Sequence, residues 1–198
     1  MKHPAPWLII GGLLQAAAAF VAVLVPPLGF DSRSPAWWTV CLAVMHVPQA
    51  AGFSLLARSA SGLVARVGFR TTAVAVAVFV PAELAALVSA DAAGMIFAIA
   101  SPLSGLGLLV AGVATVRRGD WPGIGRFTPL ITGLYVFVVL TPSLAMLGPI
   151  AAVLAIGGWG GCFALLGAAT RRRLLADRLC ADPSDSSQSI ARPATESE

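Results

Sequence analysis

Charged side chains are scarce in this chain of 198 residues. They make up 11% of the sequence, whereas 58% of the residues are hydrophobic. A soluble domain carries roughly 25% charged residues, and its core is too small to bury an apolar fraction this large. The mean hydropathy of +0.86 points the same way. The low charge therefore excludes an ordinary soluble domain and indicates that much of the chain faces lipid.

Cysteine is also scarce, and the three cysteines lie far apart. Cys41 and Cys162 are in apolar segments, and Cys180 is in the polar C-terminal part of the chain. There is no C-x-x-C pair and no cluster of Cys with His, so the sequence predicts neither a structural disulfide nor a metal site. We interpret the two cysteines in apolar segments as small hydrophobic residues that pack against their neighbours.

Catalytic and cofactor motifs are missing as well. The sequence has no G-x-S-x-G nucleophile elbow and no H-E-x-x-H zinc motif. The Gly-rich segment 119–125 follows no predicted strand and lacks the Lys-Ser/Thr of a phosphate loop. A b-type haem in a membrane generally needs paired histidines, and His46 has no intramembrane partner because His3 is at the N-terminus. We therefore predict no catalytic residue, no cofactor and no metal.

What the sequence does contain is six long apolar segments. A helix needs about 20 apolar residues to cross roughly 30 Å of hydrocarbon, whereas barrel strands would alternate polar and apolar residues. The predicted fold class is therefore all-α, a six-helix transmembrane bundle that forms one domain over residues 1–170. The helices are expected at 7–28, 36–57, 71–90, 93–116, 127–147 and 150–170.

The C-terminal segment 171–198 has a different composition. It begins with RRRLLADRLC, which predicts one or two turns of a basic amphipathic helix at the membrane surface. It ends in Ser, Asp and Pro residues that are too polar to bury a core. We predict a basic juxtamembrane segment followed by a disordered cytoplasmic tail.

The basic residues fall almost entirely on one side of the predicted bundle. With six helices, 12 of the 13 Lys and Arg residues lie on the side of the two termini, and Arg33 is alone on the other side. The positive-inside rule places such an excess in the cytoplasm. The sequence therefore predicts a protein of the bacterial inner membrane with both termini cytoplasmic. Tryptophans at the ends of the predicted helices fit an aromatic belt; they are Trp7, Trp37, Trp38 and Trp121.

The net charge of +4 is explained by this topology, so we predict no nucleic-acid partner. The predicted partner is the lipid bilayer, with a second copy or another membrane protein as open alternatives. Close packing is expected at Gly157-x-x-x-Gly161 in the last helix, because small residues let helix backbones approach. Trp159 lies between these glycines and is expected to fill a gap against another helix.

Four polar residues lie inside the apolar segments. Glu83 is the only acid well within a predicted span, where an ionisable group costs roughly 2.5–3.5 kcal/mol. We therefore expect it to face the bundle interior, within hydrogen-bond reach of His46 on the preceding helix. Gln49 shares a helical face with His46, and Gln15 on the first helix completes a predicted polar cluster. The cluster either couples a proton or cation, or is structural and orients the helices.

Prolines interrupt four of the apolar segments, and each removes a backbone hydrogen bond and bends its helix. They are Pro48, Pro81, Pro102 and Pro142. In transporters, such breaks at mid-depth expose backbone groups to a substrate. The alternative is ordinary bending, with nearby hydroxyls satisfying the freed carbonyls. The hydroxyl residues that could line a cavity are Ser101, Ser104, Thr141 and Ser143.

The hairpin pattern carries a resemblance. One stretch is AVMHVPQAAGFSLLARSASGLVARVGF followed by VPAELAAL, and a later one is VAGVATVRRGDWPGIGRFTPLITGLY followed by GGWGGCFALLGAATRRR. A helix that ends in R-x-G-x-x-P, a new helix, and a last helix with Gly, Trp and a basic end resemble a broad group of bacterial six-helix membrane proteins. That group has no assigned activity, so the resemblance implies the topology and no function.

The leading functional hypothesis is a small, non-catalytic, transporter-like or permease-accessory protein. The alternative is a structural or regulatory membrane subunit whose basic face binds a partner, and an intramembrane enzyme is the weaker third option. The polar cluster separates the first two hypotheses: a cluster that lines a wet cavity favours transport, and a dry cluster sealed by Ala and Leu favours the structural subunit.

Overall fold

The structure is a computed structural model and describes residues 3–25, 28 and 34–181. The described part is all-helical, and six of its helices are long and apolar enough to cross a membrane, so this part of the prediction is confirmed. The single helices are α1 (Pro4–Leu24), α2 (Ala36–Ser59), α3 (Leu63–Ala86), α4 (Ala90–Arg118) and α7 (Pro149–Ala181). The fifth crossing, Gly123–Met146, consists of η2 (Gly123–Phe127), α5 (Thr128–Tyr135), η3 (Val136–Leu140) and α6 (Thr141–Met146).

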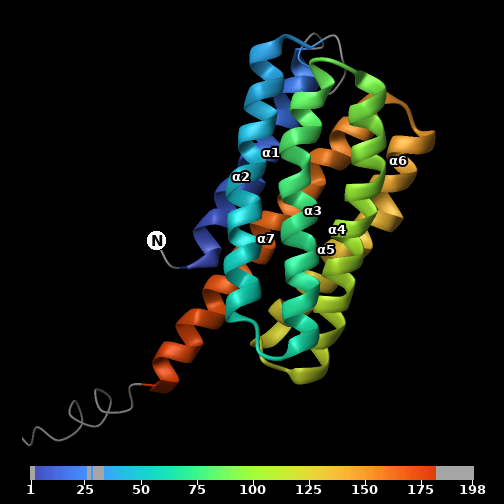
Figure 1. Cartoon of the computed structure of the whole chain (residues 1–198). Coiled ribbons are helices and arrows are strands. Elements are labelled where there is room, and N and C mark those ends of the chain that lie inside the picture. The colour runs from blue at the N-terminus through green and yellow to red at the C-terminus, as the bar shows by residue number, and fades with distance from the viewer. Residues whose placement is uncertain (1–2, 26–27, 29–33, 182–198) are drawn as a thin grey trace, which may run out of the picture.

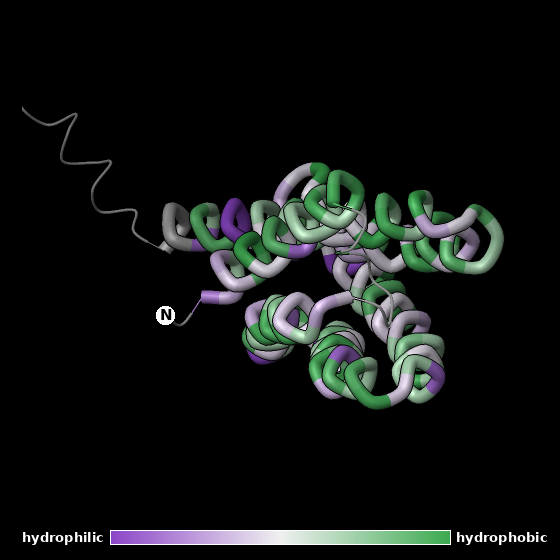
Figure 2. Tube along the Cα trace, turned by 90° about the horizontal axis from the view of Figure 1, so that it is seen from above, coloured by the Kyte–Doolittle hydropathy of each residue, from purple (hydrophilic) through white to green (hydrophobic). Residues whose placement is uncertain are grey.

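Helices that follow one another in the chain pack side by side, and α7 returns to α1. Contacts join α1 to α2, α2 to α3, α3 to α4, α4 to α5, α5 to α7 and α7 to α1, so the six crossings form a closed ring. In Figure 1, α2, α3 and α4 form the front layer, with α1 and α7 behind. Apolar residues cover much of the helices seen from above in Figure 2, and large apolar side chains such as Leu13, Val138 and Leu165 are exposed.

The third crossing begins earlier than the sequence predicted. A loop was expected over 58–70, but α3 begins at Leu63, and the turn before it contains Gly62 at a φ of 91°. The predicted span did not include Arg66 and Arg70, because charged residues interrupt the apolar segment. In the structure these arginines lie on the exposed side of a regular helix. The other side of the same turns is buried and packs against the bundle. The helix therefore extends beyond the apolar window that marks the span.

The fifth crossing is not one continuous α-helix. Residues Val136–Leu140 form a π-helical segment, followed by the short α6 with Pro142 in its first turn. Proline has no N–H to donate to the carbonyl four residues earlier. The backbone N–H of Thr141 and its hydroxyl, the latter at 2.8 Å, both donate to the carbonyl oxygen of Val136, five residues earlier. Pi-helical turns inside α-helices are frequent at functional sites, and this one borders the cavity described below.

The last helix continues past its predicted end at residue 170. It runs through the arginine segment to Ala181 as one helix, and Figure 1 shows its end projecting beyond the other helices. The basic segment is thus a continuation of the last crossing and not a separate surface helix. Residues 182–198, on which the prediction of a disordered tail falls, lie outside the described residues, as do Lys2, Arg33 and Arg192.

Candidate functional site

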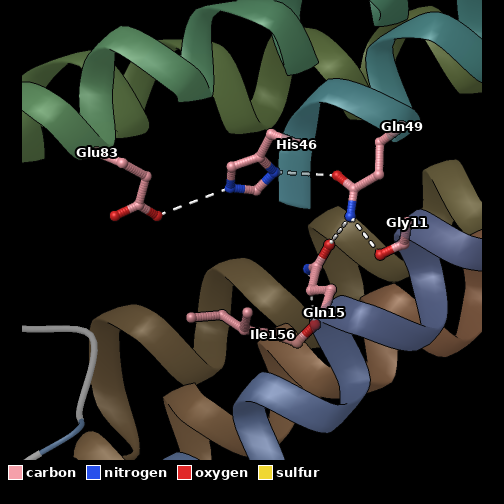
Figure 3. Close-up of polar contacts among 6 residues, drawn as sticks. All are labelled: Gly11, Gln15, His46, Gln49, Glu83 and Ile156. Atoms are coloured by element: carbon pink, nitrogen blue, oxygen red, sulfur yellow. Dashed lines mark hydrogen bonds and ion pairs between the residues drawn. The ribbon is translucent and has the colours of Figure 1, made fainter. Parts of the chain in front are cut away.

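The four predicted polar residues lie together on neighbouring helices (Figure 3). Gln15 is on α1, His46 and Gln49 are on α2, and Glu83 is on α3. Each is at least nine-tenths buried. The structure therefore brings together all the residues that the cost of burying polar groups in lipid had singled out.

Hydrogen bonds join three of these residues into a chain with a fixed direction. Gln15 Nε2 donates to the carbonyl oxygen of Ile156 on α7 at 2.9 Å. Gln49 Nε2 donates to the carbonyl oxygen of Gly11 at 3.0 Å and to Gln15 Oε1 at 2.7 Å. Because a backbone carbonyl can only accept, these two carbonyls fix the orientation of both amides. Gln49 Oε1 is consequently the atom that faces His46, 3.0 Å from Nδ1.

The direction of this chain determines the tautomer of His46. Since Gln49 Oε1 is an acceptor, His46 Nδ1 carries a proton. The other ring nitrogen, Nε2, is then the atom that gains or loses a proton, and it lies 3.7 Å from Glu83 Oε1. This is an ion-pair separation, longer than a hydrogen bond, so the expected direct hydrogen bond is not formed. The imidazole and the carboxylate thus face each other at ion-pair distance.

Glu83 and His46 line a cavity of about 380 Å³. The cavity lies between the second halves of α1 and α3 and the first halves of α2, α4 and α7, with η3 and α6 at one side. It extends from the middle of the bundle to the end where Ser34 and Ala90 lie. This is the end opposite the arginine-bearing links α2–α3 and α4–η2. Gln15, His46 and Glu83 therefore border a cavity, whereas Gln49 does not line it.

Three aromatic side chains line the same cavity. The ring of Phe79 lies 5.5 Å from that of Phe97 and 5.8 Å from that of Trp159, measured between centroids. It also lies 5.1 Å from the His46 ring. Among the described lining residues there is no Lys or Arg, and the remaining wall is mostly Ala, Leu, Met and Ile. The cavity thus combines one acid, one imidazole and a group of aromatic rings.

Of the four hydroxyl residues near prolines, Ser101 alone is among the described lining residues. Ser104 donates to the carbonyl oxygen of Ser101 at 2.7 Å, and the hydroxyl of Thr141 bonds within its own helix as described above. Ser143 is buried but does not line the cavity. Ser104 and Thr141 thus bond within their own helices, but not to the carbonyls that lie four residues before the nearby prolines. Only Ser101 is placed as the cavity interpretation requires.

The aromatic lining was missed by the sequence analysis except for Trp159, which does fill space between helices and contacts Phe79 and Phe163. A signal for Phe79 existed, because it lies four residues before Glu83 and so shares its helical face. No comparable signal marks Phe97, whose position depends on how α4 is rotated against α3.

In the Arg-rich half of the bundle, glycines allow direct contact between the backbones of neighbouring helices. A Cβ at Gly12 would lie 2.5 Å from the carbonyl oxygen of Gly160, and one at Gly68 would lie 2.6 Å from that of Gly107. The predicted packing residue Gly161 is not part of this contact, since a Cβ there would meet nothing within 4 Å. The rotation of α7 turns Gly160, one residue earlier, toward α1.

At the Arg-rich end, the loop between α2 and α3 is bonded to the loop between α4 and η2. Ser61, before α3, donates a hydrogen bond to Asp120, and Arg118 Nε pairs with the same carboxylate at 3.0 Å. The hydrogen bond from Ser61, followed by the bond and charge of Arg118, keeps the pKa of Asp120 below its usual range. The neighbouring Trp121, predicted to lie in an aromatic belt, is buried with Arg173 of α7 over its ring at 5.7 Å.

No group of three His, Cys, Asp or Glu that could hold a metal ion occurs in the part of the chain that the structure describes. The prediction that the protein uses no metal stays a prediction. Comparisons with protein-family models, curated proteins and solved structures found no match to the chain. The resemblance of its hairpin pattern to bacterial six-helix membrane proteins therefore also stays a prediction.

Proposed function

We propose that the protein is a small, non-catalytic, transporter-like protein of the bacterial inner membrane, with both termini in the cytoplasm. In this proposal the cavity opens on the side away from the cytoplasm and takes up a small molecule from there. The lipid bilayer is its surrounding partner, and no nucleic acid or cofactor is involved.

The orientation rests on the arginines. Every Lys or Arg whose side chain the structure describes lies at the end of the bundle formed by the α2–α3 link, the α4–η2 link and the end of α7. Anionic lipids of the cytoplasmic leaflet attract such a face by about 1 kcal/mol for each cation near the surface. A reporter test follows directly: alkaline phosphatase fused after Glu198 is expected to be inactive, and strong periplasmic activity would contradict the orientation.

The transport-like function rests on one observation, the cavity that contains Glu83 and His46. Buried ionisable groups inside a membrane protein that face a cavity mark ligand and ion pathways. A structural subunit has no use for such a cavity, since filling it with apolar side chains would increase stability. The cavity volume falls at the lower end of the range of small-molecule sites, roughly 300–1,000 Å³.

Access to the cavity can be measured with two serines one turn apart on α4. Ser101 lines the cavity, whereas Ser104 is fully buried outside it. In a background in which the three native cysteines are replaced by alanine, Ser101→Cys is expected to react with a small, charged thiol reagent added outside the cell, and Ser104→Cys is not. If Ser101→Cys is as inert as Ser104→Cys, the cavity is dry and the structural-subunit alternative is favoured.

A further inference from the structure

Resting on this proposed function, we propose that the cavity binds a small organic ammonium ion of about the size of choline, and that binding displaces the proton held by Glu83 and His46. The ammonium group takes the place of the proton as the counter-charge of the Glu83 carboxylate. Three features of the site favour such a cation: the charges that face the cavity, its aromatic walls and the direction of the hydrogen-bond chain.

The charges that face the cavity favour a cation. Among the described lining residues, His46 from α2 and Glu83 from α3 are the only titratable side chains, and α1, α4, α6, α7 and η3 contribute none. With one proton on the pair, the site is neutral. When His46 Nε2 releases this proton to solution, Glu83 remains as an unpaired carboxylate, and a cation of charge one restores neutrality. An anion would find no Lys or Arg there, and a divalent metal would find one carboxylate and one imidazole.

The hydrogen-bond chain allows His46 to become neutral without losing its position. Its Nδ1 stays bonded to Gln49, which is anchored through Gln15 and two backbone carbonyls on α1 and α7. Only Nε2, the nitrogen next to Glu83, exchanges its proton (Figure 3). The proton therefore leaves from the atom that borders the carboxylate, and the imidazole keeps its orientation while the cation is bound.

The aromatic walls distinguish an organic cation from an inorganic one. Phe79, Phe97 and Trp159 lie on the same cavity as Glu83, and aromatic rings bind alkylated ammonium groups through cation–π attraction while tolerating their methyl groups. A small inorganic ion would need several oxygen ligands in place of its hydration shell. The lining has one carboxylate, and its other side-chain oxygens are spread over separate elements, on Gln15, Ser34, Thr39 and Ser101. The rest of the wall is mostly Ala, Leu, Met and Ile, which suits the alkyl part of an organic ion.

The test uses calorimetric titration of the purified full-length protein with choline. Two probes of the same shape serve as comparisons: the neutral analogue in which carbon replaces the nitrogen, and an anionic analogue with a carboxylate. Choline is expected to bind at least about tenfold more tightly than either, the size of a partly desolvated cation–π and ion-pair contribution. Equal or tighter binding of the neutral or anionic analogue, or no binding of any probe, overturns the inference.

The displaced proton is counted by repeating the titration in two buffers of different ionisation enthalpy. One proton released for each choline bound is expected, and the Kd should fall as the pH is raised while the pair still carries its proton. Binding that releases no proton overturns the exchange. Glu83→Gln should weaken choline binding about tenfold or more and abolish proton release, whereas Glu83→Asp should retain both in part. Asp91→Asn removes an exposed acid at the same end outside the cavity and should change neither.

The thiol-labelling pair on α4 separates this inference from the function on which it rests. If Ser101→Cys is labelled but choline binds no better than its neutral analogue, the cavity is accessible and the inference about the cation alone is wrong. If Ser101→Cys is not labelled and no probe binds, the proposed function itself is wrong.

Discussion

The two halves of the bundle are built from different residues. In the Arg-rich half, glycines such as Gly12, Gly68 and Gly160 bring helix backbones into direct contact, and the links between helices bond to each other. In the other half, the helices are separated by a cavity with aromatic walls. The polar chain through Gln49 lies between the two halves and connects α1, α2 and α7.

The two halves thus differ in how closely the helix backbones approach. Close backbone contact at these glycines leaves no space for even a methyl group between the helices. The cavity half includes a π-helical turn at Val136–Leu140, where the regular pattern of α-helical hydrogen bonds is interrupted. Three predictions test this comparison, beginning with the largest expected effect.

The first prediction compares two adjacent glycines on α7. Gly160→Ala places a Cβ 2.7 Å from the carbonyl oxygen of Gly12, which forces the helices apart and should cost about 1–3 kcal/mol of stability. Gly161→Ala meets nothing within 4 Å and should be neutral or stabilise the helix by about 0.5–1 kcal/mol. Thermal unfolding of the detergent-solubilised variants measures both, and equal effects would refute close contact between α1 and α7.

The second prediction concerns the boundary between the halves. Gln49→Leu removes the bonds to Gly11 and Gln15 and leaves His46 Nδ1 without its acceptor. This should lower the free energy of unfolding by about 1–2 kcal/mol, the range that model peptides give for interhelical hydrogen bonds in membranes. Gln15→Leu should cost less, because Gln49 keeps its bond to the Gly11 carbonyl. The ratio of the two effects is read from unfolding in increasing denaturant, and a larger effect for Gln15→Leu would contradict the direction assigned to the chain.

The third and smallest effect is expected at the Arg-rich end. The pKa of Asp120 is lowered in the folded protein, so its contribution to stability is present above the ordinary value of 3.8 and is lost as the pH falls through the folded pKa. The pair is partly exposed to solvent, so the effect should be below about 1 kcal/mol. Stability measured from neutral to acidic pH should fall more for the native chain than for Asp120→Asn, and parallel curves would count against the link between the loops.

The sequence predicted the number of crossings because a span in lipid requires a long apolar segment whatever its neighbours are. It also predicted the polar cluster, for a reason particular to membranes. In a soluble protein the apolar face of a helix marks the core, but here both faces are apolar, and residues such as Glu83 and Gln49 are the main indication of the interior. Those residues lie where this argument places them.

The remaining features depend on helix rotation, which apolar sequence does not encode. That Gly160 and not Gly161 meets α1, and that Phe97 reaches the cavity, follow from the packing of one helix against another. The start of α3 at Leu63 escaped for a related reason, since Arg66 interrupts the apolar run although it lies on the exposed side of a regular helix. The π-helical turn before Pro142 also escaped, because a proline in the sequence predicts a break but not which carbonyl the backbone N–H of Thr141 takes.

The measurement that tests the account most directly is nitrogen NMR of the His46 ring. The chain has two histidines, so a His3→Gln variant leaves one signal set to assign. We expect Nδ1 to carry a proton throughout, and Nε2 to carry one that is lost when choline is added at constant pH. A neutral His46 with its proton on Nε2 and none on Nδ1, or a ring unchanged by saturating choline, would contradict the account.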